Sequence, residues 1–337
     1  MIESWCVRVP KSLGEPARRI LYRRGELVAT LKPRVVGDYV AYPVASAERA
    51  SSILLSEGIE AEPCRDLFEE YRRARAGPAP RGYLVVGDIV LFSGRREELE
   101  DLREAARVVM ESQPRVKAAF AKVRVEGDYR RPSLVHLAGE KRTWTLHKEH
   151  GLRFYVDIAK AYFNPRLAYE HRRVASMASD GERVLDMFSG VGGFSLHIAS
   201  LARARVLAVD LNPYAAAYAA INVALNRRRL RGEVLVLRAD ASRLPSILRG
   251  GFTRIIMNHP TASVKYLGHA CRLAADGAMA HVYVFSLSWL EARDTVLEAL
   301  EASSCGAEIL GVREVLEYSQ DTSLYALDVR LIGAPKA

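Results

Sequence analysis

The alternation of apolar and polar residues changes about halfway along the 337-residue chain. From about residue 183, short β-branched runs are separated by alanine-rich stretches of helical character; the runs are RVLDMF, RVLAVD, EVLVLRAD, RIIMN and AHVYVF. This rhythm is typical of a parallel sheet built from βαβ units. Two further runs, AEILGVREVLEYS and LYALDVRLI, are separated only by a short loop containing QDT, so the sheet is expected to close with an antiparallel hairpin. The pattern predicts an α/β fold.

The first half of the chain predicts two smaller α+β domains. The first contains the strand-like runs WCVRV and DYVAYPV, a helix-like stretch at about 12–24, and amphipathic stretches around 47–57 and 64–75. The second contains YLVVGDIVLF, a charged helix, AFAKVRV, and a hairpin in which EHG joins TWTLHK to LRFYVDI. Gly and Pro interrupt the pattern in RRARAGPAPRG and predict a linker. We expect α+β domains at 1–75 and 83–163, a linker at 76–82, and the parallel-sheet domain at 164–337.

The composition is that of a folded protein without a membrane segment. Hydrophobic residues make up 49% of the chain and charged residues 26%, and no apolar run approaches the length of a membrane span. The N-terminal stretch MIESWCVRVPKSL has neither a basic leader nor an apolar core, so no signal peptide is expected. The expected location is cytoplasmic, and the expected state is a monomer.

Charge and cysteines narrow the choice of partners. The net charge is +9, and 40 of the 49 basic residues are arginine, which suits phosphate and base contacts in a nucleic acid. A solvated arginine-rich surface explains the charge equally well. The four cysteines, at positions 6, 64, 271 and 305, lack the C-x-x-C spacing of zinc sites, so no metal is expected. Whether any of them pair is left open.

A glycine-rich turn follows the first strand of the predicted parallel sheet. In LDMFSGVGGFSL, Asp186 ends the strand, and Gly190 and Gly192 let a ligand approach the backbone. The third glycine of a dinucleotide-binding loop is absent. Two later strands end in Asp210 and Asp240, suited to the ribose hydroxyls and the adenine amine of a nucleoside. This set favours S-adenosylmethionine over a dinucleotide; the alternative is that each aspartate only caps a helix.

The fourth parallel strand ends in the turn NHPT. This strand should neighbour the first, so Asn258 is expected to face the ligand, where its carboxamide can read a nucleobase edge. Pro260 fixes the backbone that presents it. Enzymes that methylate exocyclic base amines commonly have an aromatic residue in the position of Thr261, so that chemistry is disfavoured. The alternative is that Asn258 caps the next helix; His259 is given no role.

A helix is predicted to lead into the sheet in YFNPRLAYEHRRVASMA. Asn164 is suited to the N-cap and Pro165 to the first helical position. Arg166 and Arg173 flank Glu170 at the spacing of one helix face. Spacing alone favours a surface ion-pair ladder.

Together these stretches resemble the archaeal and eukaryotic tRNA (guanine37-N1)-methyltransferases. The resemblance covers nearly the whole chain and lies in CVRVPKSLGEPARRIL, VEGDYRRPSLVHLAGE, HKEHGLRFYVDIAKAYFNPRLAYEHRR, VLDMFSGVGGFSL and RIIMNHPTASVKYL. It implies three domains, the last a Rossmann-type, S-adenosylmethionine-dependent methyltransferase domain. It also implies that tRNA is bound through its anticodon loop and outer corner, and that N1 of guanosine 37 receives the methyl group.

The resemblance assigns roles to individual residues. Glu170 would be the general base that takes the N1 proton, Asn258 would orient the base, and Arg130 would stabilise charge on O6. The residues expected to bind the methyl donor are Tyr162, Arg166, Asp186, Phe188, Gly190, Gly192, Asp210, Asp240, Asn258 and Pro260.

Three departures from the family pattern leave alternatives open. Asn164 stands where the family usually has Ser, His259 where it has Leu or Pro, and Gly193 where it has Pro. Methyl transfer to C7 of the tricyclic wyosine precursor at the same position is one alternative. Aminocarboxypropyl transfer to that precursor is another, although that sister family lacks the Asn-x-Pro turn. A catalytically silent tRNA-binding protein is a third. NRRRLRG, at 226–232, is a candidate phosphate contact or a solvated helix end.

Overall fold

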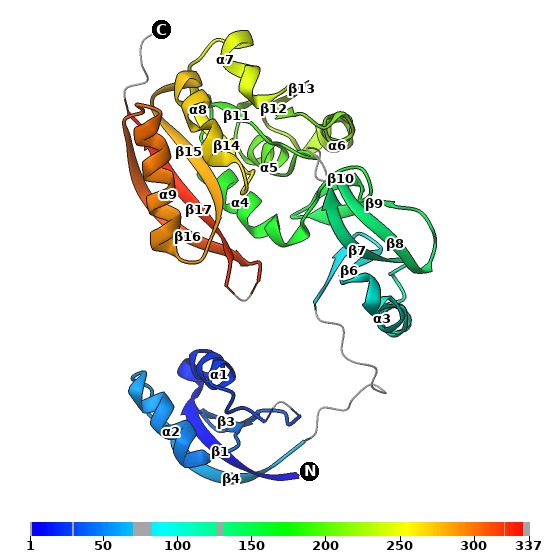
Figure 1. Ribbon diagram of the computed structural model, residues 1–337, viewed down its shortest axis with the longest axis vertical. Helices are drawn as coiled ribbons and strands as arrows, with labels where there is room; N and C mark the ends of the chain where they lie inside the picture. Colours follow the sequence, from blue (N-terminus) through cyan, green and yellow to red (C-terminus); the bar gives the residue numbers. More distant parts are fainter. Residues whose placement is uncertain (1, 29, 70–81, 127–130, 320, 333–337) are drawn as a thin grey trace. The chain divides into compact units, whose positions relative to one another are not determined.

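The computed structural model describes residues 2–28, 30–69, 82–126, 131–319 and 321–332. The chain forms two compact units, Met1–Ala76 and Gly77–Ala337, and each is described by itself (Figure 1). None of the helices within the described residues is both long enough and apolar enough to cross a membrane.

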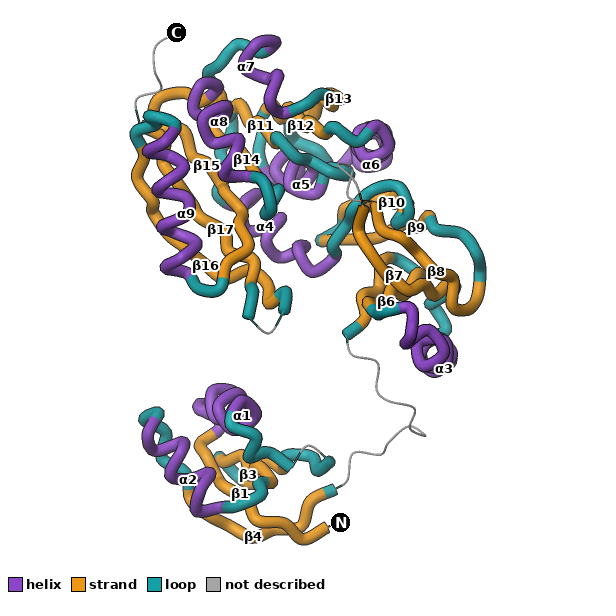
Figure 2. Tube along the Cα trace, viewed as in Figure 1, coloured by secondary structure: helices purple, strands orange, loops and turns teal. Residues whose placement is uncertain are grey.

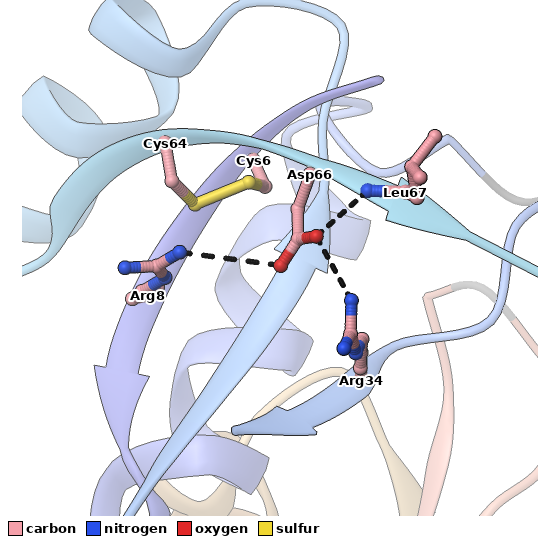
Figure 3. The surroundings of a disulfide bond; sticks show 6 residues. All are labelled: Cys6, Arg8, Arg34, Cys64, Asp66 and Leu67. Carbon is pink, nitrogen blue, oxygen red and sulfur yellow. Dashed lines mark hydrogen bonds and ion pairs between the residues drawn. A yellow bond between two sulfur atoms is a disulfide. The ribbon is translucent and has the colours of Figure 1, made fainter. Parts of the chain in front are cut away.

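The first unit is a four-stranded antiparallel sheet with two helices; the α+β character is as predicted, but the stretch from residue 64, expected to be amphipathic, begins in strand β4. The strand order is β2-β3-β1-β4, and apolar residues of the sheet pack with α1 and α2 in one core. A disulfide joins Cys6 and Cys64, which face each other across β1 and β4 (Figure 3). Beside it, Asp66 pairs with Arg8 and Arg34. The bounds are β1 Ile2–Pro10, η1 Lys11–Leu13, α1 Gly14–Arg23, β2 Arg34–Val36, β3 Tyr39–Pro43, α2 Ala47–Ser56 and β4 Glu62–Phe68.

The second unit begins with a four-stranded sheet and a separate hairpin. The sheet order is β5-β6-β7-β8, with α3 packed through its apolar face against it. The predicted hairpin is present as β9 and β10, which turn at His150 and Gly151, both with positive φ. The bounds are β5 Tyr83–Val86, β6 Ile89–Ser93, η2 Arg96–Glu98, α3 Leu99–Ser112, β7 Ala118–Glu126, β8 Arg131–Gly139, β9 Trp144–Glu149 and β10 Leu152–Asp157.

Helix α6 (Pro213–Asn226) lies beside this hairpin (Figure 2), and two of its asparagines attach the hairpin to the rest of the unit. The carboxamide of Asn222 accepts from the amide of Tyr155 at 2.6 Å and donates to its carbonyl at 3.2 Å. Asn226 makes the same pair of bonds with Arg153, at 2.9 and 2.7 Å. Both asparagines are fully buried. Two side chains one helical turn apart therefore satisfy the outward backbone groups of β10.

The remainder of the unit is the predicted α/β sheet. Its order is β13-β12-β11-β14-β15-β17-β16; β11 to β15 are parallel, and β17 and β16 form the antiparallel close. Strand β14 lies beside β11, as expected. The bounds of the strands are β11 Arg183–Asp186, β12 Arg205–Asp210, β13 Glu233–Arg238, β14 Phe252–Met257, β15 Ala274–Ser286, β16 Ala307–Glu317 and β17 Ser323–Leu331.

Helices cover both faces of this sheet because its strands are apolar on both sides. Ile255 belongs to the core shared with α8 and α9, and its neighbour Ile256 to the core shared with α4 and α5. A second disulfide, Cys271 to Cys305, links α8 to the end of α9. The bounds are η3 Pro165–Leu167, α4 Ala168–Ser176, α5 Gly193–Leu201, η4 Arg227–Arg229, η5 Ala241–Arg243, α7 Leu244–Ile247, η6 Ser263–Tyr266, α8 Leu267–Leu273 and α9 Trp289–Ala302.

Candidate active site

A cavity of about 740 Å³ opens at the carboxyl ends of the parallel strands. This is the edge of the sheet where ligands bind in doubly wound folds. Eight of the residues predicted to form the site line it: Tyr162, Arg166, Phe188, Gly190, Asp210, Asp240, Asn258 and Pro260. The β16–β17 hairpin adds Leu316, Glu317 and Tyr318, which the sequence did not indicate. Arg130 lies outside the described residues.

The glycine loop is held by the carboxylate that ends β12. Gly190 and Gly192 have positive φ angles of 54° and 94°, which favour glycine. The amide of Gly190 donates to Asp210 at 2.7 Å, and the amide of Asn212 donates to the other oxygen at 2.8 Å. Burial raises the pKa of Asp210 above its usual range. Asp210 therefore fixes the loop while it lines the cavity.

Asp186 lies behind the loop and is not part of the cavity lining. Its side chain is fully buried, and Ser195 donates to it at 2.7 Å. Burial raises the pKa of Asp186 to about 7. Ser195, which stands where a dinucleotide loop has its third glycine, is thus used to hold this carboxyl. Asp186 and Gly192 shape the loop from behind.

Asp240 caps a helical turn at the edge of the cavity. It lines the cavity, and its carboxylate accepts from the amide of Ser242 at 2.8 Å at the start of η5. That hydrogen bond is the main reason why the pKa of Asp240 is lowered. The capping alternative is therefore confirmed for Asp240, and it leaves the second carboxylate oxygen for a ligand.

The Asn258 turn is organised by a buried serine. Ser263 is fully buried; its hydroxyl donates to the carbonyl of Met257 at 2.5 Å and accepts from the amide of His259 at 3.1 Å. Among the described residues, the carboxamide of Asn258 has no hydrogen-bond partner, and the residue at the N-cap of η6 is Ala262. Asn258 lines the cavity, so the alternative that it caps the helix is wrong.

His259 belongs to an aromatic wall of the cavity. Its ring meets that of Phe188 edge to face at 5.1 Å, and the ring of Tyr266 also meets that of Phe188 edge to face, at 5.2 Å. All three residues line the cavity. The histidine that the sequence left without a role thus supports the ring of a predicted donor-binding residue.

Glu170 is buried behind the cavity in a network of ion pairs, here termed the Glu170 network. Its carboxylate is 1% exposed and accepts two hydrogen bonds of 2.8 Å from Arg173 and one of 2.7 Å from Tyr283. The members are Glu170, Arg173, Tyr283, Asp328, His281, Arg254 and Glu182, joined by hydrogen bonds of 2.6 to 3.1 Å. The surface ladder favoured by spacing is wrong, because Arg166 lies in the 3-10 turn and lines the cavity instead.

The next residue on α4, His171, explains one departure from the family pattern. A Cβ at Gly193 would lie 2.6 Å from Cε1 and Nε2 of the imidazole, so any larger residue there would displace the ring. His171 also lies 2.9 Å from Glu149, and His197 of α5 lies 3.8 Å from the same carboxylate. The sequence did not indicate these three residues, because they come from distant segments with no recognisable spacing.

Comparisons with known proteins agree with this geometry. Residues 145–310 match the TRM5/TYW2 methyltransferase domain, and residues 55–143 match the TYW2 N-terminal domain. The tRNA (guanine(37)-N(1))-methyltransferase Trm5b of Pyrococcus abyssi is 33% identical over 97% of this chain and 98% of its own length. The tRNA 4-demethylwyosine(37)-methyltransferase Taw21 of Saccharolobus solfataricus is 38% identical over 59% of this chain and 76% of its own. A solved complex of aTrm5 with tRNALeu has a TM-score of 0.67 at 30% identity and covers 97% of this chain and 99% of that one.

Proposed function

The chain belongs to the TRM5/TYW2 methyltransferase family, and we propose that it transfers the methyl group of S-adenosylmethionine to N1 of guanosine 37 in tRNA. The predicted enzyme class and cofactor, a methyltransferase that uses S-adenosylmethionine, are confirmed by the family. The observation that carries the finer proposal is Asn258, which lines the cavity beside the glycine loop with an uncommitted carboxamide. The chain is similar over nearly its whole length to Trm5b of Pyrococcus abyssi, an enzyme named for methylation of guanine N1. This similarity also supports N1 as the methylated atom.

The cavity residues fit the methyl donor. Asp210 keeps lone pairs for the ribose hydroxyls after accepting from Gly190 and Asn212, and the second oxygen of Asp240 can accept from the adenine amine. Phe188 offers an aromatic face, held in place by His259 and Tyr266. When bound, S-adenosylmethionine supplies an electrophilic methyl group on a sulfonium centre.

The guanine is positioned and deprotonated by residues of the chain. The carboxamide of Asn258 can donate to O6 and accept from a ring or amino N–H, so it orients the base edge. Guanine N1 carries a proton, and a carboxylate must accept it as the new bond forms. We assign this role to Glu170, with Arg130 stabilising charge at O6. Because Glu170 does not line the cavity and both of its oxygens accept hydrogen bonds from Arg173, it must turn away from Arg173 to reach the base.

Replacement of the proposed base tests this assignment. Glu170→Gln should lower the rate of methyl transfer to guanosine 37 by at least about 100-fold, the usual contribution of a general base. The measurement is single-turnover transfer of a labelled methyl group, with the modified nucleoside identified by mass spectrometry. Donor affinity, measured by calorimetry, should change little because Glu170 does not line the cavity.

Asp328→Asn is the matched control. It disturbs the Glu170 network through Arg173 and His281 but leaves the proposed base in place. If both variants lose the same activity, the effect belongs to the network and Glu170 is not the base. Full activity of Glu170→Gln would overturn the assignment directly.

The similarity to the Taw21 methyltransferase supports methyl transfer to C7 of the wyosine precursor as a second candidate. Incubation with tRNA carrying guanosine 37 and with tRNA carrying the tricyclic base separates the two reactions. Aminocarboxypropyl transfer is disfavoured by Asn258 and Pro260, and its product would carry the larger group in the same mass spectrum. A silent tRNA-binding protein would fail to bind the donor. Cytoplasmic location and a monomeric state stay predictions.

A further inference from the structure

A cluster of buried metal-ligating side chains lies next to the cavity and has no part in the proposed reaction. Glu149 ends β9, His171 lies on α4 and His197 lies on α5; they are 3%, 5% and 0% exposed. One ligand atom of each lies within 4.8 Å of those of the other two. We refer to these three residues as the Glu149 cluster. Three separate segments of the fold therefore bring two imidazoles and a carboxylate to one point.

The hydrogen bonds of His197 determine where its lone pair points. Its Nδ1 lies 2.8 Å from the carbonyl oxygen of Gly193, so Nδ1 carries the proton and donates. The lone pair is then on Nε2, which is 3.8 Å from Glu149 Oε2. Within the described part of the chain, this buried Nε2 has no hydrogen-bond partner, nor has Oε1 of Glu149. Buried polar atoms left unpaired are rare in folded proteins and indicate an unaccounted partner.

The surroundings of the Glu149 cluster are largely aromatic, and burial keeps His197 neutral. Phe154 stacks on His197 with ring centres 5.8 Å apart, and Phe194 meets His171 edge to face at 4.6 Å. Burial lowers the pKa of His197 to about 4. A neutral imidazole whose other N–H is held by a backbone carbonyl is the usual state of a metal ligand.

Two further histidines face the cluster without being ligands. Nδ1 of His147 accepts from the amide of Gly87 at 3.0 Å, so its Nε2 carries a proton, 3.7 Å from Glu149 Oε1. His147 is thus oriented as a donor to the carboxylate. His150 is exposed at the hairpin turn, with its ring 5.8 Å from that of His197.

We propose that Glu149, His171 and His197 form a binding site for a divalent transition-metal cation, with zinc the best match. Two imidazole nitrogens and one carboxylate oxygen are a common zinc ligand set, and a fourth position remains for water. Nδ1 of His171 and Nε2 of His197 lie 2.9 and 3.8 Å from Glu149 Oε2. Small side-chain movements would therefore bring all three atoms to about 2.0–2.2 Å from a shared ion. For Nδ1 of His171 to bind the ion, the proton on Nδ1 moves to Nε2 of the same ring, so His171 binds as a neutral imidazole and no proton is lost.

The ion would connect β9, α4 and α5. His171 lines the cavity and fills the space above Gly193, so its position affects the wall of the donor site. Without an ion, the hydrogen bond between His171 and Glu149 uses only one carboxylate oxygen and leaves His197 unsatisfied. The sequence expectation of no metal rested on cysteine spacing and did not consider these residues.

Metal binding is measured on the full chain, without tRNA or methyl donor, so the result is independent of the proposed function. After treatment with a chelator and its removal, the protein is titrated with Zn²⁺ by calorimetry and with Co²⁺ by visible absorption. We expect one ion per chain, the intense visible bands of tetrahedral Co²⁺, and a higher melting temperature with the ion. No binding by the folded wild-type chain would overturn the proposal.

Variants locate the site. Glu149→Gln and His197→Gln keep the side-chain size approximately and should weaken binding at least about 100-fold, because even loss of outer partners costs 10–100-fold. His150→Asn is the matched control, since His150 neighbours His197 but is exposed, and Asn tolerates its positive φ of 45°. Wild-type affinity in a folded Glu149→Gln or His197→Gln chain would place the ion elsewhere. Circular dichroism checks folding, and His171→Asn replaces any variant that does not fold.

Discussion

Two adjacent residues of α4, Glu170 and His171, belong to buried polar clusters of opposite character. In the Glu170 network, both oxygens of Glu170 accept hydrogen bonds, and the chain of contacts continues to Glu182. In the Glu149 cluster, a nitrogen of His197 and an oxygen of Glu149 have no partner among the described residues. A network that satisfies its own groups stabilises the fold, whereas unpaired lone pairs can bind something else.

Removal of a central cation from the Glu170 network should have the largest effect on stability. Arg173→Met leaves Glu170 and Asp328 buried without their main partner, which should lower the free energy of unfolding by about 3–5 kcal/mol. Urea unfolding at neutral pH measures this. Arg172→Met is the control, because Arg172 is the exposed neighbour on the same helix. Equal stability of the two variants would show that the network contributes nothing.

Acid should weaken both buried clusters through histidines that burial keeps neutral, His197 in the Glu149 cluster and His281 in the Glu170 network. The pKa of His197 is about 4 in the folded chain and about 6.5 when unfolded, so the unfolded state binds the proton first as pH falls. The contribution of neutral His197 to the free energy of unfolding is fully present above pH 6.5. It should fall by about 3 kcal/mol between pH 6.5 and 4. Burial opposes ionisation of Asp328, yet hydrogen bonds from His281 and Arg173 hold its pKa below the usual range, so its contribution is lost only at lower pH.

The pH dependence is measured by urea unfolding at closely spaced pH values with a chelator present. His197→Gln should make the curve less steep between pH 6.5 and 4, because one titrating imidazole is gone while His147 and His281 remain. A slope as steep as that of the wild-type chain would assign the acid sensitivity to another group.

The smallest effect should come from the contact between His171 and the glycine loop. In Gly193→Ala, the new methyl group overlaps the imidazole of His171. Overpacking of this kind should lower the free energy of unfolding by about 1–3 kcal/mol. The double variant Gly193→Ala/His171→Ala removes the overlap. If the cost of Gly193→Ala is unchanged when His171 is already Ala, the overlap is not its cause.

The sequence predicted the architecture well because strand-forming runs and their order are local properties. The parallel strands with their antiparallel close, the hairpin at His150 and Gly151, and the cap at Asn164 are all encoded in residues close together in the chain. The position of the cavity could also be predicted from the sequence, because Gly190, Asp210 and Asn258 each follow a predicted strand, and parallel strands end at the same edge of the sheet.

The two buried clusters could not be predicted in this way. Tyr283 is 113 residues from Glu170, and Asp328 is 155 residues from Arg173, so only the completed sheet brings them together. The spacing of charged residues on α4 indicated a ladder of ion pairs at the surface, because spacing contains no information on which elements pack against the helix. The same holds for Glu149 and His197, whose segments meet only through the attachment of the hairpin to the sheet.

The carboxamides of Asn222 and Asn226 have a consequence for assembly. An open strand edge such as that of β10 is a template onto which another chain can add a strand and begin to aggregate. The asparagines occupy the backbone groups of Arg153 and Tyr155 through which such an addition would begin. The β10 edge of the hairpin is therefore closed, and two buried side chains of one helix protect the protein from self-association there.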